Sequence, residues 1–158
     1  MPTANPYASF LDGRPTPDIL ADTPIALASI FASLTPSQAL QSPAPGKWSP
    51  LEVLCHLADC EIAHGFRLRQ TVSLSNPLLQ PFDQDLWAIG YRSHSVAEAL
   101  ALFTSLRNWN LAFVAALPPS SLTRTAHHPE RGDLTLQILL DTMAGHDLNH
   151  ITRFRVLL

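Results

Sequence analysis

The chain has 158 residues, the usual size of one domain, and can form a core that is stable without disulfides or a structural metal. Hydrophobic residues make up 46% and charged residues 15% of the sequence, which excludes disordered and fibrous proteins. A formal net charge of -3, with ten Lys and Arg residues that form no run, argues against nucleic acid as a partner, because proteins that bind it neutralise its phosphates.

The N-terminal sequence MPTANPYASFLDGRPTP has no basic region followed by an apolar run, so it does not predict a secretory signal. No stretch approaches the ~20 apolar residues of a membrane-spanning helix, and we expect no membrane partner. Cys55 and Cys60 lie five residues apart in one predicted helix and point in divergent directions, so no disulfide is expected between them. Reduced thiols are typical of the cytosol, and the expected location is cytoplasmic.

Prolines and capping residues divide the chain into segments. Residues 1–16 are rich in proline and have little apolar pattern, which predicts a flexible N-terminal arm, whereas residues 17–158 are expected to form one helical domain. The first helix is predicted to begin with Thr23 as its cap and Pro24 in its first turn, and to continue through IALASIFASL. A start near Thr16 is the alternative.

The second predicted helix is the best marked. Ser49 and Glu52 form a capping box around a proline in the first helical position, and the helix should span roughly residues 50–73. Residues 74–94 mix turn signals with aromatic residues and predict a long crossover that carries a short helix around DQDLWAIG.

Two further helices follow the crossover. Ser95 and Glu98 form a second capping box, for a helix that reaches about Ala116. After a loop with the sequence SSLTRTAHHPERG, either Asp133 or Thr135 caps a last helix that runs to the C-terminus or nearly so. No run of alternating β-branched residues is present, so strands are not expected. The pattern predicts an all-α four-helix bundle with one long crossover and short extra helices.

Three histidines lie on predicted inward faces. In AGHDLNHITRF, residues 144–154, His146 and His150 lie four apart at the border of an apolar arc of ~160°, and His56 begins a similar arc on the second helix. Two imidazoles one turn apart can bind one ion, although hydrogen bonding alone also explains a buried pair. With His56 they can form a set of three nitrogens that leaves coordination positions open, as in catalytic sites. Such a set suits zinc, nickel or iron, and also copper.

The strings GKWSPLEVLCHLADCE, HHPERGDLTLQILL and AGHDLNHITRF resemble the DinB-like superfamily, which includes YfiT-like enzymes related to bacillithiol- and mycothiol-dependent transferases. The resemblance covers roughly residues 20–158. It implies a four-helix bundle, commonly dimeric, with a divalent metal on three histidines that correspond to His56, His146 and His150. Members of the family transfer low-molecular-weight thiols, isomerise thiol-linked substrates, or have no known activity.

Other polar residues on the second helix are candidates for catalysis. Cys60 lies one turn after His56, where a thiolate could bind the ion, but a small core residue is the alternative. Arg67 and Glu61 are candidates to position a substrate carboxylate and to accept a proton, and a structural ion pair between them explains both equally well.

Two aspartates are candidates to accept the outer proton of a histidine ligand. Asp59 lies three residues after His56 and Asp147 follows His146 directly. For Asp147, a solvated surface charge is the alternative.

The leading functional hypothesis is a metal-dependent transferase that joins a small thiol to an electrophilic substrate. A bound divalent ion lowers the pKa of a thiol or water, so the nucleophile is an anion at neutral pH. No GxSxG motif or phosphate-binding glycine loop competes with this hypothesis. A metal-dependent hydrolase or isomerase with the same histidines, and a non-catalytic metal- or ligand-binding bundle, stay open.

A homodimer is also expected. On the second helix, Leu51, Cys55, Ile62 and Phe66 fall outside the arc of His56 and form a second apolar stripe, which could cover a partner chain or pack inside the same bundle.

Overall fold

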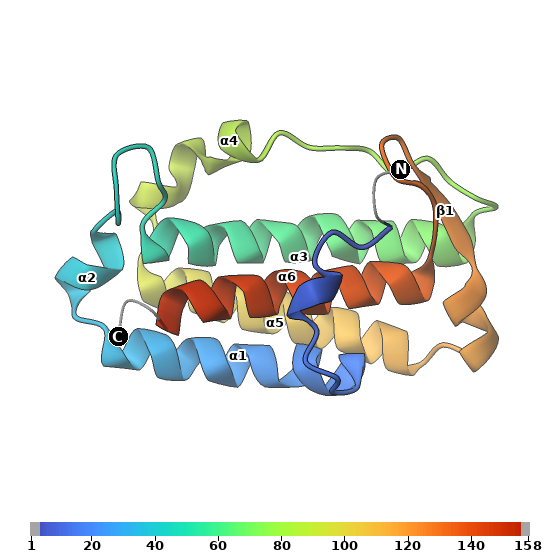
Figure 1. The fold of residues 1–158 in the computed structure, drawn as a ribbon, viewed down its shortest axis with the longest axis horizontal. Helices are drawn as coiled ribbons and strands as arrows, with labels where there is room; N and C mark the ends of the chain where they lie inside the picture. The colour runs from blue at the N-terminus through green and yellow to red at the C-terminus, as the bar shows by residue number, and fades with distance from the viewer. Residues whose placement is uncertain (1–3, 156–158) are drawn as a thin grey trace.

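The computed structural model describes residues 4–155, so the last residues of the predicted final helix lie outside the described part. Four long helices form a bundle: α1 (Thr16–Ser33), α3 (Pro50–Ser73), α5 (Val96–Ala115) and α6 (Leu136–Arg155) (Figure 1). Each packs against two neighbours, in the order α3, α5, α1, α6 around the bundle. The predicted four-helix bundle is confirmed.

Short elements connect the long helices. They are the 3-10 turns η1 (Ala8–Phe10), η2 (Ala88–Ser93) and η3 (Pro119–Thr123), the short helices α2 (Pro36–Leu40) and α4 (Gln84–Trp87), and the strands β1 (Thr125–His128) and β2 (Gly132–Thr135). The crossover between α3 and α5 carries α4 as predicted, and returns the chain along the bundle so that α5 begins at the same end as α3 (Figure 1).

The expectation of no strands is wrong, because β1 and β2 form an antiparallel hairpin in place of the predicted loop. Each strand has only four residues, too few for a period of two to be recognised. The hairpin is held by its surroundings: Ala126 and Leu134 are buried, and the crossover donates and accepts backbone hydrogen bonds with His127.

The capping boxes predicted the starts of α3 and α5 correctly. Ser49 and Ser95 each accept a hydrogen bond from the N–H of the glutamate three residues on, and each glutamate carboxylate accepts one in return. Of the two candidate caps for α6, Thr135 is the one used, since its hydroxyl accepts the N–H of Ile138 at 3.2 Å. Asp133 lies in β2 instead, 2.7 Å from a ring nitrogen of His127.

The first helix begins at Thr16, the alternative start, and Thr23 is not its cap. Pro24 therefore lies inside α1, where it has no N–H for the carbonyl of Leu20. Arg107 of α5 supplies the missing donor, with its Nη1 atom 2.9 Å from that oxygen. A helix interior with proline is thus stabilised by a side chain from a neighbouring helix.

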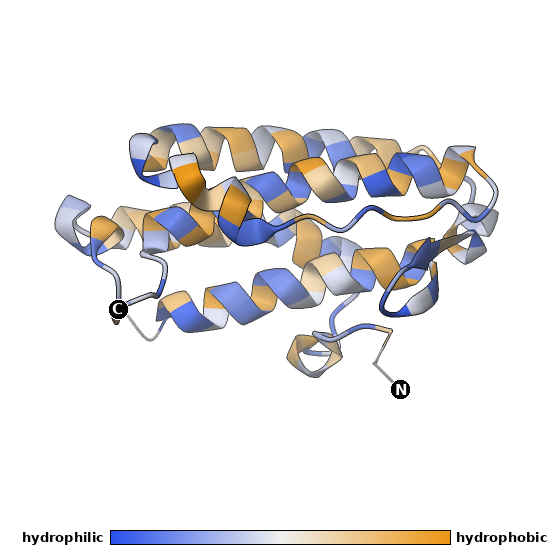
Figure 2. Ribbon diagram, turned by 90° about the horizontal axis from the view of Figure 1, so that it is seen from above, coloured by the Kyte–Doolittle hydropathy of each residue, from blue (hydrophilic) through white to orange (hydrophobic). Residues whose placement is uncertain are grey.

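Each long helix carries both apolar and polar residues along its length (Figure 2), as expected for bundle helices that bury one face. No helix among residues 4–155 is long and apolar enough to cross a membrane. Between α3 and α5, Gly65 allows close approach: a Cβ atom there would lie 2.6 Å from the side-chain oxygen of Asn110.

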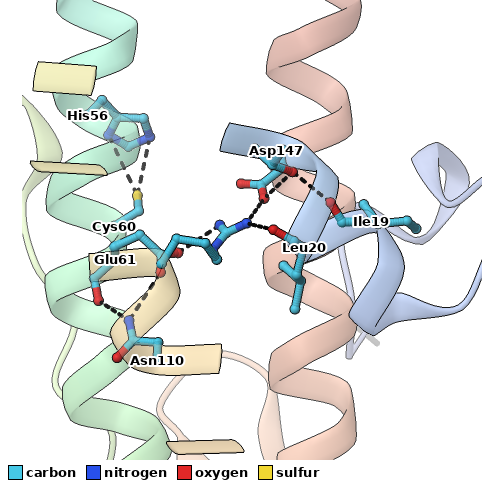
Figure 3. Close-up of polar contacts among 9 residues, drawn as sticks. Ile19, Leu20, His56, Cys60, Glu61, Asn110 and Asp147 are labelled. Carbon is cyan, nitrogen blue, oxygen red and sulfur yellow. Dashed lines mark hydrogen bonds and ion pairs between the residues drawn. The ribbon is translucent and has the colours of Figure 1, made fainter. Parts of the chain in front are cut away.

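A buried polar cluster centred on Arg107 joins all four long helices. Figure 3 shows Leu20, Glu61 and Asp147, which come from three of these helices and face one another. The guanidinium of Arg107 is 2.8 Å from Glu61 of α3, 2.8 Å from Asp147 of α6 and 2.9 Å from the Leu20 carbonyl of α1. Burial alone would lower the pKa of Arg107, but the two carboxylates raise it overall. Burial raises the pKa of Asp147, although Arg107 opposes that shift.

Replacement of Arg107 by Met should lower the free energy of unfolding by about 3–5 kcal/mol, because it leaves Glu61 and Asp147 buried without their cation. Urea denaturation measures the change. Arg92→Met is the matched control, since Arg92 is exposed in its pair with Glu52 and its loss should cost at most about 1 kcal/mol. Equal, small losses in both variants would contradict the structural role of Arg107.

Candidate metal centre

The three inward histidines converge at one point between α3 and α6. The Nε2 atom of His146 is 3.2 Å from Nε2 of His56 and 3.1 Å from Nε2 of His150. One nitrogen from each ring lies within 4.8 Å of the others, and all three residues are buried. His146 and His150 meet because they are one turn apart on α6, whereas His56 arrives from α3, packed alongside.

These separations fit a shared ion. Zinc–nitrogen bonds of about 2.0–2.1 Å place two ligand nitrogens about 2.9 Å apart at a right angle and about 3.3 Å apart at a tetrahedral angle. The two measured distances, 3.1 and 3.2 Å, lie between these limits. An imidazole set of this kind suits a divalent transition metal, and leaves coordination positions free.

Burial keeps the three imidazoles neutral, as metal ligands must be. It lowers the pKa of His56, and Asp59 opposes that shift only in part. The pKa of His146 falls well below its usual range through burial and then through His150 and His56. Burial and the neighbouring His56 lower the pKa of His150 to about 3. At neutral pH each ring therefore keeps a nitrogen lone pair for a metal ion.

Two cavities meet at the histidines. The Trp48 cavity, of about 670 Å³, is lined by all three histidines together with Trp48, Val53 and Phe154 among others. The Arg67 cavity, of about 480 Å³, is lined by His56 and His146 together with Cys60, His64, Arg67 and Arg131 among others. Because His56 and His146 belong to both walls, molecules in the two cavities can approach the same point from different sides.

The predicted catalytic candidates on α3 have separate environments. Cys60 lies 3.5 Å from Nε2 of His56 and lines the Arg67 cavity, and burial raises the pKa of its thiol. Glu61 contacts Arg107 and Asn110 rather than Arg67, so the ion pair considered between Glu61 and Arg67 is not formed. Arg67 lines the cavity and donates a hydrogen bond to the Gln80 carbonyl.

Neither aspartate candidate bonds a histidine of the cluster. Asp59 accepts a hydrogen bond of 2.6 Å from the Tyr91 hydroxyl. Asp147 is buried against Arg107 and the hydroxyl of Thr23, so the alternative of a solvated surface charge is wrong as well. Its carboxylate holds α6 in place and does not orient an imidazole.

Three residues around the cluster were not singled out from the sequence. The Trp48 ring lies 5.0 Å from the His56 ring and the Tyr7 ring 5.1 Å from the His146 ring, centroid to centroid, and Arg131 lines the Arg67 cavity. Gly145, next to His146, is the sequence feature that could have indicated a contact with Tyr7. A Cβ atom at position 145 would lie 2.6 Å from the Tyr7 carbonyl oxygen. The glycine lets the N-terminal segment cross α6 at the cluster.

A sequence model of the family described as the DinB superfamily matches residues 19–152. A protein of Oceanobacillus iheyensis named "putative metal-dependent hydrolase" is 28% identical over 133 residues, which cover 84% of this chain and 77% of that protein. A protein of Bacillus mycoides with the same name is 25% identical over 132 residues, 83% of this chain and 76% of that protein. The solved structure of Bacillus subtilis YfiT, described as "a probable metal-dependent hydrolase with an unusual four-helix bundle topology", matches with a TM-score of 0.84 at 23% identity, over 90% of this chain and 83% of that chain. At this identity, the match to YfiT shows a shared fold.

Substitution of His56, His146 or His150 by Ala should each lower the affinity for zinc by more than about 100-fold, because each removes one of three nitrogen ligands. Elemental analysis after dialysis against zinc or nickel measures the bound metal, and circular dichroism checks that the helices persist. The control is His94→Ala, since His94 is exposed on the crossover. Full metal content in any one of the three variants would remove that histidine from the set.

Proposed function

The chain belongs to the DinB superfamily, and we propose that it is a metal-dependent transferase that joins a low-molecular-weight thiol to an electrophile. His56, His146 and His150 would hold the ion. A bound divalent cation lowers the pKa of a thiol or water, so that the nucleophile is an anion at neutral pH. The observation that carries the proposal is the pair of cavities that meet at His56 and His146.

Two cavities favour transfer over hydrolysis. A transferase must bring two organic molecules to one point, whereas a hydrolase needs one organic molecule and water. Trp48 packs against His56 and Tyr7 packs against His146, and these contacts hold the two rings that both cavities share. The positions of the imidazoles are therefore fixed by packing before any substrate arrives.

Among residues 4–155, Cys60 is the candidate nucleophile of the protein at this point, and it is buried. In the absence of an ion, burial, together with Asp147 and Glu61, raises the pKa of its thiol. A protonated thiol is a poor nucleophile. The attacking group that we propose is an external thiol: its sulfur forms a bond to carbon, the leaving group departs with its electron pair, and the thiol proton passes to solvent.

The names of the curated relatives favour a second candidate, a metal-dependent hydrolase with the same three histidines. In that case water replaces the thiol, and the product contains no sulfur from a second substrate. An isomerase would return a product of unchanged composition, and a non-catalytic bundle would return none. Product analysis separates these functions.

Incubation of the metal-loaded protein with a panel of small thiols and chlorodinitrobenzene should yield a thioether and chloride, detected by mass spectrometry. Chelator and the His146→Ala variant should each reduce the rate at least about 100-fold, because both remove the ion. His94→Ala should keep the wild-type rate. A product that lacks the thiol, or a chelator effect on the melting temperature alone, would reject the transferase.

We also propose that the chain forms a homodimer through α3 and α5. Leu51 and Cys55 of the predicted stripe are buried in the chain's own core, but Ile62 and Phe66 are exposed. Trp109 of α5 is 71% exposed and adjoins Asn110, the residue that contacts Gly65 beside Phe66. Large apolar side chains on adjoining helices are typical of an interface.

A Trp109→Glu substitution should convert a dimer to a monomer in sedimentation velocity, since it would bury a charge between the two chains. Ile25→Glu is the matched control, because Ile25 is as exposed as Trp109 but lies on α1. A wild-type chain that sediments as a monomer would rule out the dimer.

A further inference from the structure

The Arg67 cavity carries an excess of positive charge. Its lining includes two guanidinium groups, Arg67 and Arg131, and one carboxylate, the exposed Glu130. Burial lowers the pKa of His64 to about 3 and also lowers that of His128, so both imidazoles are neutral at neutral pH. The charged groups of the cavity wall therefore sum to one positive charge.

Arg67 is 8% exposed and forms no ion pair with any residue between 4 and 155. Within the described part of the chain, its guanidinium donates one hydrogen bond, from Nη2 to the Gln80 carbonyl, and lies 5.6 Å from the centre of the Phe82 ring. Burial lowers the pKa of Arg67, and Arg131 lowers it further. Two like charges thus face the same cavity.

Arg131 and His64 present unused polar atoms. Within the described residues, Nη1 of Arg131 and Nδ1 of His64 are buried without a hydrogen-bond partner. Glu130 is next to Arg131 in sequence, yet the pair forms no ion pair, and burial lowers the pKa of Arg131 despite that carboxylate. Arg107, buried elsewhere in the bundle, has two carboxylate partners instead.

A buried cation without a partner is costly, and an anion that enters the cavity would remove that cost. A guanidinium matches the two oxygens of a carboxylate, and in the metal-free protein the single net positive charge of the wall matches a monoanion better than a phosphate dianion. We propose that the Arg67 cavity binds the carboxylate of a small organic acid, with Arg67 and Arg131 as its direct partners.

The same cavity wall includes His56 and His146, so the remainder of the bound acid points toward the candidate metal centre. Arg67 follows His56 by eleven residues, roughly three turns or ~16 Å along α3, and its side chain leans back toward the N-terminus of the helix. The acid is therefore elongated, with its carboxylate at one end and its reactive atom at the other. The role of the acid as a substrate rests on the proposed function. The binding of the acid to the cavity does not.

Titration of the metal-free protein with hexanoate and with hexanamide, followed by two-dimensional NMR, tests the carboxylate site without any catalysis. Wild-type protein should bind hexanoate at least about tenfold more tightly than hexanamide, since charged hydrogen bonds are the stronger ones. Arg67→Met and Arg131→Met should each lose most of this preference. Arg67→Lys should keep part of it, because the charge remains and the planar fork is lost.

The control is Arg92→Met, because Arg92 is exposed, lines neither of the two cavities, and its removal changes the net charge equally. Circular dichroism confirms that each variant is folded. Equal binding of hexanoate and hexanamide by wild-type protein, or a preference that survives in both Arg67→Met and Arg131→Met, would overturn the proposal.

Two transfer assays then ask which substrate carries the carboxylate. ω-Sulfanylhexanoate serves as the thiol in one and ω-bromohexanoate as the electrophile in the other, each compared with its amide. A rise in KM of about tenfold in Arg67→Met, confined to a carboxylate substrate, assigns the anion to that substrate. Arginine-dependent hexanoate binding without any thioether product would support the carboxylate site and reject the transferase. Transfer that is equally fast with acids and amides would support the transferase and reject the carboxylate site.

Discussion

The guanidinium of Arg107 is the contact on which the bundle depends. It neutralises Glu61 of α3 and Asp147 of α6, and it also satisfies the Leu20 carbonyl that Pro24 leaves without a donor in α1. One side chain of α5 therefore fixes the positions of the three other long helices. Since a buried charge without a partner costs several kcal/mol, the helices cannot slide past one another without losing this arrangement.

The same contact positions the candidate metal centre. Asp147 follows His146 directly, and Glu61 lies five residues after His56, so the charges that lock α3 against α6 are next to the histidines that must meet. The charges of the Arg107 cluster are paired within the chain. Arg67 and Arg131 instead face a cavity and form no ion pair with any residue between 4 and 155.

Much of the fold could be predicted from the sequence because local interactions determine it. The capping boxes at Ser49 and Ser95 use residues three apart, and the period of 3.6 residues identified the inward faces of α3 and α6. The start of α1 was misplaced because Pro24 usually marks a first helical turn. Here it is tolerated in the interior through Arg107, which lies more than eighty residues away.

The sequence by itself determined the four helices, the crossover and the inward direction of His56, His146 and His150, since each follows from residues within a few turns of one another. Only the tertiary structure decided what surrounds those histidines. Tyr7, Trp48 and Arg131 come from the N-terminal segment, the loop before α3 and the hairpin, where no periodicity indicates a direction. Their positions depend on packing between segments distant in the chain. The same is true of the ion pairs that Arg107 forms and the two arginines of the cavity do not.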